Sequence, residues 1–95
     1  MYVVIFKATA KQQNQLYLDT VEKMRSLAFK KYNCVDFVAL TEGKQEIALS
    51  YWHKQEDIVA WRNDAEHLLA QQHGKTKWYS EYSVEVAKIE RQYSN

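Results

Sequence analysis

The sequence contains one cysteine, two glycines and no proline among its 95 residues. With Cys34 alone the chain can form no intramolecular disulfide, a composition typical of proteins of the reducing cytoplasm. No apolar stretch approaches the roughly 20 residues that span a bilayer. The apolar run near the N-terminus has neither basic residues before it nor the cleavage site of a signal peptide. We therefore expect a cytoplasmic protein with no membrane partner.

An excess of one charge is also lacking, since 13 basic and 12 acidic residues leave a net charge of +1. Proteins that bind nucleic acid or an anionic membrane usually carry an excess of basic residues. Lys75 and Lys77 beside Trp78 are compatible with stacking on nucleic-acid bases, but a solvated turn is the simpler interpretation. We expect no nucleic-acid partner.

The spacings of metal ligands are missing too. The histidines His53, His67 and His73 are scattered, and the sequence contains neither HExxH nor paired cysteines. We therefore expect no metal site. Because no base stands beside it in the sequence, Cys34 is predicted to be buried and unreactive.

Aromatic residues, by contrast, make up 14% of the chain. A domain of 95 residues, which no linker, repeat or low-complexity segment divides, builds only a modest core. Its aromatic content is more than such a core readily hides, which indicates a ligand cavity or a subunit interface.

Residue patterns predict the element order β-α-β-β-α-β. In chain order we expect a strand over 2–7, a helix from 9 to about 31, a strand hairpin over 35–52, a helix over 54–72 and a strand over 78–91. Thr9 opens a capping-box sequence for the first helix. Gly43 lies in the hairpin turn, and His73 with Gly74 closes the second helix.

This order predicts a ferredoxin-like α+β fold, with a four-stranded antiparallel sheet and two helices on one face. The first hairpin strand is apolar on both sides, since Val35, Phe37 and Ala39 alternate with Val38 and Leu40. An antiparallel strand with one buried face should alternate apolar and polar residues. A second copy of the sheet is the simplest cover for the open face, so we expect a homodimer through the sheets.

The segments EIALSYWHKQEDIVAWRNDAEHLLAQQHGK and WYSEYSVEVAKIER resemble the antibiotic biosynthesis monooxygenase domain family. The resemblance extends over nearly the whole chain and implies a single domain over residues 1–95. It also implies a dimeric α+β barrel, made by two sheets packed face to face, with a pocket between each sheet and its helices. Characterised members of the family oxidise aromatic polyketides and quinols without metal or flavin, and others degrade haem.

Only part of the haem-degrading pattern is present. Those members have an asparagine at the end of the first strand, a tryptophan on the second helix and a ligating histidine ten residues later. Trp61 matches the tryptophan, but Gln71 stands ten residues beyond it and Lys7 lies near the first-strand position. His67 and His73 fall on other faces of a helix with 3.6 residues per turn. Haem degradation is therefore disfavoured.

The candidate site residues are three aromatic side chains and one histidine. Trp61 lies in the apolar stripe of its helix, either as a pocket wall or as an indole that stacks on a flat substrate. Tyr51 and Trp52 point to opposite faces of a strand, one to the pocket and one to the dimer interface. All three are predicted to bind substrate. His67 points away from the stripe, which favours a structural role beside Asp64, and the resemblance keeps it as the candidate acid–base catalyst.

Two classes of function stay open from the sequence. The leading hypothesis is a cofactor-independent monooxygenase of a small aromatic or quinol-like substrate, with molecular oxygen as the co-substrate. The alternative is a non-catalytic dimer that binds a small hydrophobic ligand or has a structural role, and haem degradation ranks third. No paired acid and base is evident in the sequence to decide between them.

Overall fold

The computed structural model describes residues 1–71 and 77–95. The elements are β1 (Tyr2–Ala10), α1 (Gln15–Lys31), β2 (Asp36–Glu42), β3 (Gln45–Trp52), α2 (Gln55–Gln71) and β4 (Tyr79–Lys88). This is the predicted β-α-β-β-α-β order. His73, Gly74 and Lys75, for which the sequence predicts a helix end and a turn, lie outside the described residues.

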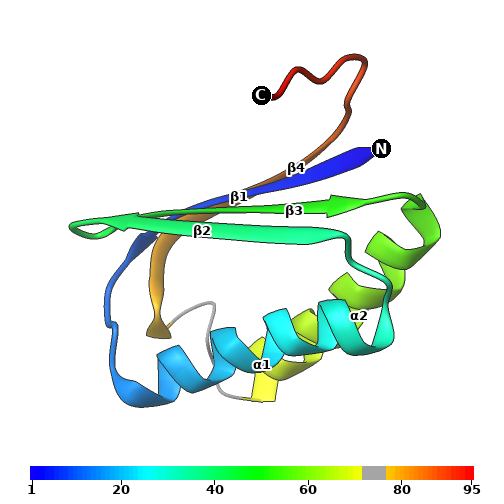
Figure 1. The fold of residues 1–95 in the computed structure, drawn as a ribbon. Coiled ribbons are helices and arrows are strands. Elements are labelled where there is room, and N and C mark those ends of the chain that lie inside the picture. Colours follow the sequence, from blue (N-terminus) through cyan, green and yellow to red (C-terminus); the bar gives the residue numbers. More distant parts are fainter. Residues whose placement is uncertain (72–76) are drawn as a thin grey trace.

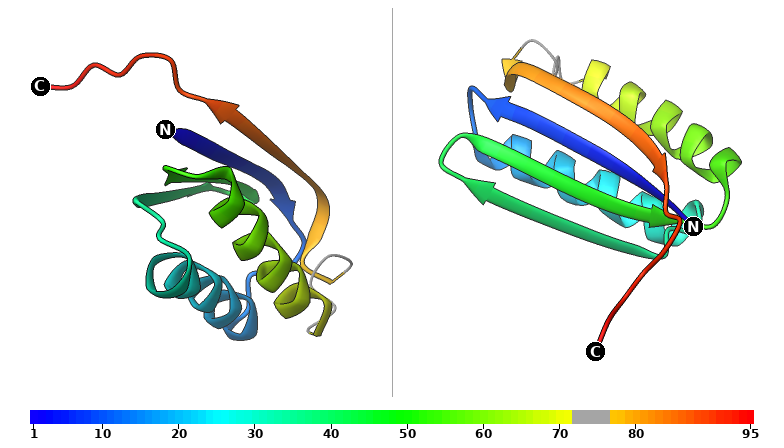
Figure 2. Two further views of the ribbon diagram at one scale, coloured as in Figure 1. Left: turned by 90° about the vertical axis from the view of Figure 1, so that its right-hand side faces the viewer. Right: turned by 90° about the horizontal axis from the view of Figure 1, so that it is seen from above.

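The strands form one antiparallel sheet in the order β2-β3-β1-β4. Both helices lie on the same face of this sheet (Figures 1 and 2). The predicted ferredoxin-like α+β fold is therefore confirmed. Among the described residues, no helix is long and apolar enough to cross a membrane.

The start of α1 differs from the prediction. Thr9 does not cap the helix, because β1 continues to Ala10 and Thr9 is paired with both β3 and β4. The cap is Asn14, whose side-chain oxygen accepts a hydrogen bond from the Tyr17 backbone N–H at 3.0 Å. The pairing of β1 with two neighbouring strands outweighs the local capping signal, so the helix cap lies five residues later than predicted.

We call the sheet face without helices the open face; β2, β3 and the first half of β1 give it apolar side chains, whereas β4 gives it Glu81, Ser83 and Glu85. Strand register places these residues on it: Val3, Ile5, Val38, Leu40, Ile47, Leu49 and Tyr51. Leu40 is 72% exposed and Ile47 46% exposed in the single chain. The two hairpin strands, β2 and β3, thus carry apolar side chains on both faces, as the sequence predicts.

The core between the sheet and the helices is divided into two clusters. The Trp52 cluster consists of Val4, Ala28, Cys34, Trp52 and Ile58, with Tyr2, Tyr32, Phe37, Trp61 and Val84 packed against them. The Tyr17 cluster consists of Ala8, Tyr17, Leu69, Trp78 and Tyr79, with Phe6, Val21 and Met24 packed against them. The site described next lies between these two clusters.

Candidate functional site

A cavity of about 190 Å³ lies between the sheet and the two helices. Most of its lining is apolar and comes from the helix-facing side of the sheet and the inner sides of both helices. The lining residues from the sheet are Val4, Phe6, Phe37, Ala39, Leu40, Thr41, Glu46, Ile47, Ala48, Ser50, Tyr79, Tyr82 and Val84. Leu40 and Ile47, which strand register places on the open face, also border the cavity. The lining residues from the helices are Tyr17, Leu18, Val21, Met24, Trp61, Arg62, Ala65, Glu66 and Leu69. Both core clusters contribute to the lining, so the cavity borders both of them.

One end of the cavity is walled by Trp61. Its indole N–H donates a hydrogen bond to the Met24 carbonyl at 2.9 Å, which ties α2 to α1. The Trp61 ring lies 5.3 Å from the Trp52 ring and 6.2 Å from the Phe37 ring, centroid to centroid. Trp52 is fully buried, and its N–H donates to the Ser50 hydroxyl at 2.8 Å. Both indoles are therefore fixed in place by a hydrogen bond as well as by packing.

The three residues predicted to bind substrate occupy three different places. Trp61 lines the cavity. Trp52 faces the helices and stands behind Trp61, where it is fully buried. Tyr51 lies on the open face of the sheet, away from this cavity. The orientation of the Tyr51–Trp52 pair, which the sequence leaves open, is thereby decided.

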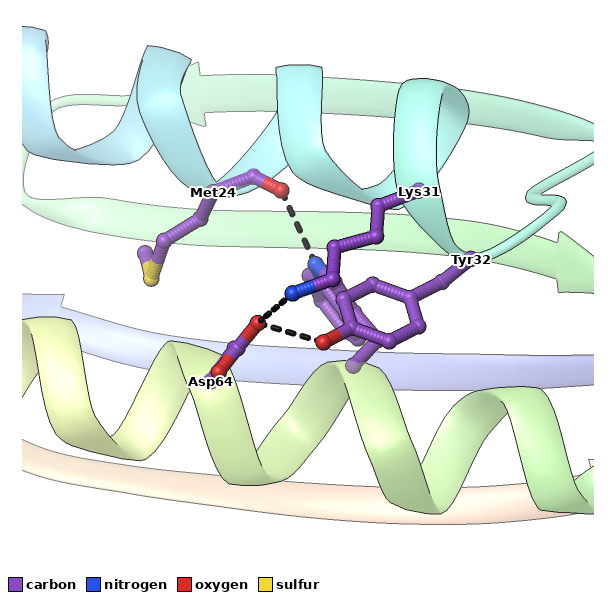
Figure 3. Close-up of polar contacts among 5 residues, drawn as sticks. Met24, Lys31, Tyr32 and Asp64 are labelled. Carbon is purple, nitrogen blue, oxygen red and sulfur yellow. Dashed lines mark hydrogen bonds and ion pairs between the residues drawn. The ribbon is translucent and has the colours of Figure 1, made fainter.

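His67 is exposed on the outer side of α2 and does not line the cavity. Its predicted neighbour Asp64 accepts a hydrogen bond from the Tyr32 hydroxyl and lies 3.5 Å from the Lys31 ammonium group (Figure 3). The Tyr32 hydrogen bond is the main cause that holds the pKa of Asp64 below its usual value, and the charges of Lys31 and His67 add to it. Asp64, Tyr32 and Lys31 thus form a polar group that joins the two helices, and the predicted catalytic role of His67 stays untested.

The other end of the cavity contains three polar residues that the sequence analysis does not single out. The Tyr17 hydroxyl donates a hydrogen bond to the Glu46 carboxylate, and the Tyr79 hydroxyl donates to the Tyr17 oxygen at 3.5 Å. The Gln13 amide donates to the second Glu46 oxygen at 2.9 Å. Burial raises the pKa of Tyr79 to about 12. Burial and the Glu46 carboxylate raise the pKa of Tyr17 further, so both phenols stay protonated at neutral pH.

Several residues bear on whether the chain could bind a metal or haem. Within residues 1–71 and 77–95, no three potential metal ligands come together. Lys7 is exposed, and its ammonium group lies 3.8 Å from the Glu85 carboxylate on the open face, away from the cavity. Cys34 is buried, as predicted, and burial raises the pKa of its thiol. None of these residues lines the cavity.

Comparison of the sequence with known proteins identifies a relative. No family model matches the chain. The uncharacterized protein YqjZ of Bacillus subtilis (strain 168) is 37% identical over 93 residues, which cover 96% of this chain and 81% of that protein.

Several solved structures share the fold. SnoaB, a cofactor-independent oxygenase from Streptomyces nogalater, has a TM-score of 0.76 at 7% identity, over 96% of this chain and 94% of that one. The "Putative antibiotic biosynthesis monooxygenase from Nitrosomonas europaea" has a TM-score of 0.72 at 14% identity, over 96% and 100%. An MhuD mutant with two manganese protoporphyrin IX molecules per active site has a TM-score of 0.68 at 14% identity, over 100% of both chains. At these identities the likeness concerns the fold.

Proposed function

Because the chain belongs to the family of YqjZ and has the fold of the antibiotic biosynthesis monooxygenase domains, we propose that it is a cofactor-independent monooxygenase of a small aromatic or quinol-like substrate. The observation that carries this proposal is the apolar cavity of about 190 Å³ with the Trp61 indole on its wall. An apolar cavity of about 150 Å³ is known to hold benzene, so this one suits a substrate of one or two fused rings. Ligand sites are mostly apolar with a few polar groups, as this cavity is.

The chemistry asks little of the protein. An electron-rich substrate supplies its own electrons: a ring C–H of a quinol becomes C–OH while the quinol is oxidised to the quinone, one oxygen atom of O₂ enters the product and the other leaves as water. The protein holds substrate and O₂ together and lowers the cost of removing the substrate proton. An apolar cavity also admits O₂, which is itself apolar. This chemistry is consistent with SnoaB, a cofactor-independent oxygenase that shares the fold.

Oxygen consumption by the pure protein, with a series of quinols and polyphenols, tests this function. We expect oxygen uptake with at least one compound. The rate of uptake should fall on the order of 10-fold or more in Trp61→Ala, because the substrate loses the side chain that positions it. Val59→Ala is the matched control, since Val59 lies on the same helix, is 60% exposed and does not line the cavity. Ligand binding without oxygen uptake would contradict turnover and support the alternative, a non-catalytic small-ligand-binding dimer.

The proposal includes a homodimer through the open faces of two sheets. Support comes from the apolar residues that stay exposed there in the single chain, above all Leu40 and Ile47. Sheets that pack face to face interdigitate such side chains across about 10 Å. A monomer would instead leave an apolar patch in water.

Sedimentation tests the dimer. We expect one species near twice 11.3 kDa, dissociation in Val38→Lys, whose new charge lies on the open face outside the cavity lining, and no dissociation in Val59→Lys, whose new charge lies on α2. A wild-type protein that sediments as a monomer would contradict the proposal.

Haem degradation stays a disfavoured alternative. MhuD shares the fold and binds manganese protoporphyrin IX, but here Lys7 faces away from the cavity and Gln71 stands where a ligating histidine is required. A haem titration should therefore give no Soret band of a histidine-ligated complex. Such a band, lost in His67→Ala, would replace the cofactor-free assignment.

A further inference from the structure

The residue that distinguishes the two ends of the cavity is Glu46. Side chains alternate along β3, so Glu46 shares the helix-facing side with Ser50 and Trp52. Among the described residues, it is the charged side chain that the sheet contributes to the cavity lining. The other charged lining residues, Arg62 and Glu66, lie on α2 with their charged groups 3.9 Å apart. Glu46 therefore gives one end of an apolar cavity a negative pole.

The hydrogen bonds around Glu46 use the protons of the neighbouring side chains and leave acceptor sites on the carboxylate. The Tyr17 hydroxyl donates to one carboxylate oxygen and the Gln13 amide to the other. The Tyr79 hydroxyl donates to Tyr17. An ionised carboxylate offers about four acceptor sites, so these bonds leave acceptor capacity on Glu46, while each phenol proton is already used. A ligand that meets this end must bring a donor.

The opposite end of the cavity is walled by the Trp61 indole, on which an aromatic ring of a ligand can stack. Ser50, beside the Trp61 wall, and Glu46 stand four residues apart on β3, roughly 13 Å along the strand. A ligand that stacks on Trp61 and reaches Glu46 is therefore longer than one ring, and two fused rings with a terminal hydroxyl span the distance once the side chains are allowed for. The cavity thus orients such a ligand in one direction.

We propose that Glu46 is the specificity-determining residue of this cavity, and that it selects fused-ring aromatics with a phenolic hydroxyl, which donates to its carboxylate. This inference rests on the proposed function, because it concerns the same binding site. It excludes two classes of ligand: aryl ethers, which lack the donor, and aryl carboxylates, which add a second negative charge beside Glu46.

Three ligands of one shape test the proposal by titration calorimetry at neutral pH: 2-naphthol, 2-methoxynaphthalene and 2-naphthoic acid. A hydrogen bond to a charged group favours the naphthol over its methyl ether by about 10-fold or more. The naphthoate should bind most weakly. Equal affinities for the naphthol and the ether overturn the proposal in the wild-type protein alone, with no variant needed.

Variants assign the selectivity to Glu46. Glu46→Gln keeps an oxygen that accepts from Tyr17 but removes the charge, so the preference for the naphthol should fall to about 3-fold or less and the naphthoate should bind more tightly. Glu46→Asp moves the carboxylate back by one CH₂ group. It replaces Glu46→Gln as the test variant if the glutamine variant does not fold. Glu42→Gln is the matched control, since Glu42 is exposed at the end of β2 and does not line the cavity. A preference that survives both Glu46 variants overturns the assignment.

The outcome separates this inference from the proposed function. Oxygen uptake with quinols but equal binding of the naphthol and its ether would refute the selectivity and leave the monooxygenase. Selective binding without oxygen uptake would refute the monooxygenase and leave Glu46 as the selecting residue of a binding protein.

Discussion

The Trp52 cluster and the Tyr17 cluster face each other across the cavity, and they satisfy their polar groups differently. In the Trp52 cluster each indole N–H has an acceptor within the fold, Ser50 for Trp52 and the Met24 carbonyl for Trp61. In the Tyr17 cluster the Tyr79 hydroxyl donates to the Tyr17 hydroxyl, which donates to the half-buried carboxylate of Glu46. The first arrangement is closed, whereas the second ends in a group that can accept further hydrogen bonds.

This difference separates structural from chemical roles. Buried polar groups that bond within the fold make it rigid, so the indoles form a wall. Two phenols with raised pKa values beside a carboxylate form a polar end where a ligand can be oriented. The Tyr17 cluster also contains the Trp78 indole N–H, which is buried and has no hydrogen-bond partner within residues 1–71 and 77–95. We expect the two clusters to respond differently to mutation and to pH.

The largest effect is expected in the Trp52 cluster. Trp52→Ala should lower the free energy of unfolding by about 3–5 kcal/mol, because it opens a cavity where a fully buried indole was packed. It also leaves the Ser50 hydroxyl, itself buried, without its partner. Urea unfolding measures the loss. Trp61→Ala, at a half-buried position on the cavity wall, should cost less; an equal or greater cost would contradict the distinction between wall and core.

High pH should act on the Tyr17 cluster. An unfolded tyrosine loses its proton near pH 10, whereas Tyr79 in the native protein keeps it to about pH 12. The unfolded state therefore releases protons first, and the free energy of unfolding falls between these values, by up to about 1.4 kcal/mol per pH unit for each such group. Tyr79→Phe should flatten this fall, and Tyr93→Phe, at an 86% exposed position, should not. Identical pH profiles for both variants would show that the buried phenol is not responsible.

The smallest effect is expected at His67, which lies outside both clusters. Because it is exposed on α2, His67→Ala should change the free energy of unfolding by no more than about 0.5 kcal/mol. Oxygen consumption should match the wild-type rate, since the imidazole does not line the cavity. A loss comparable to that of Trp61→Ala would instead support the catalytic role that the family resemblance suggests.

Much of the fold follows from periodicity. The alternation of apolar residues predicts the hairpin and its two apolar faces, and helical spacing predicts that His67 points outward, as it does. The predicted start of α1 is wrong because a local capping signal competes with strand pairing. Strand pairing joins residues that lie too far apart in the sequence for a local pattern to contain both. Thr9 is paired on both sides by residues far along the chain, Gln45 and Glu81.

The polar end of the cavity could not be predicted for the same reason. Tyr17 and Glu46 are 29 residues apart, and Tyr17 and Tyr79 are 62 apart, so no motif joins them. One signal was present: Glu46 stands six residues before Trp52, an even number, and side chains at even spacing on a strand share a face. Once Trp52 is placed against the helices, the carboxylate must lie there too.

The placement of the three tryptophans has an optical consequence. Trp52 and Trp78 are fully buried, and Trp61 borders the cavity. Light absorbed by the chain is emitted mainly by these three indoles, and only one of them can touch a bound ring. A small quencher added to the protein without ligand should therefore reduce the fluorescence of Trp61 first. A ligand that fills the cavity should protect this fluorescence from the quencher. The protein carries its own fluorescent indicator of occupancy, with no label attached.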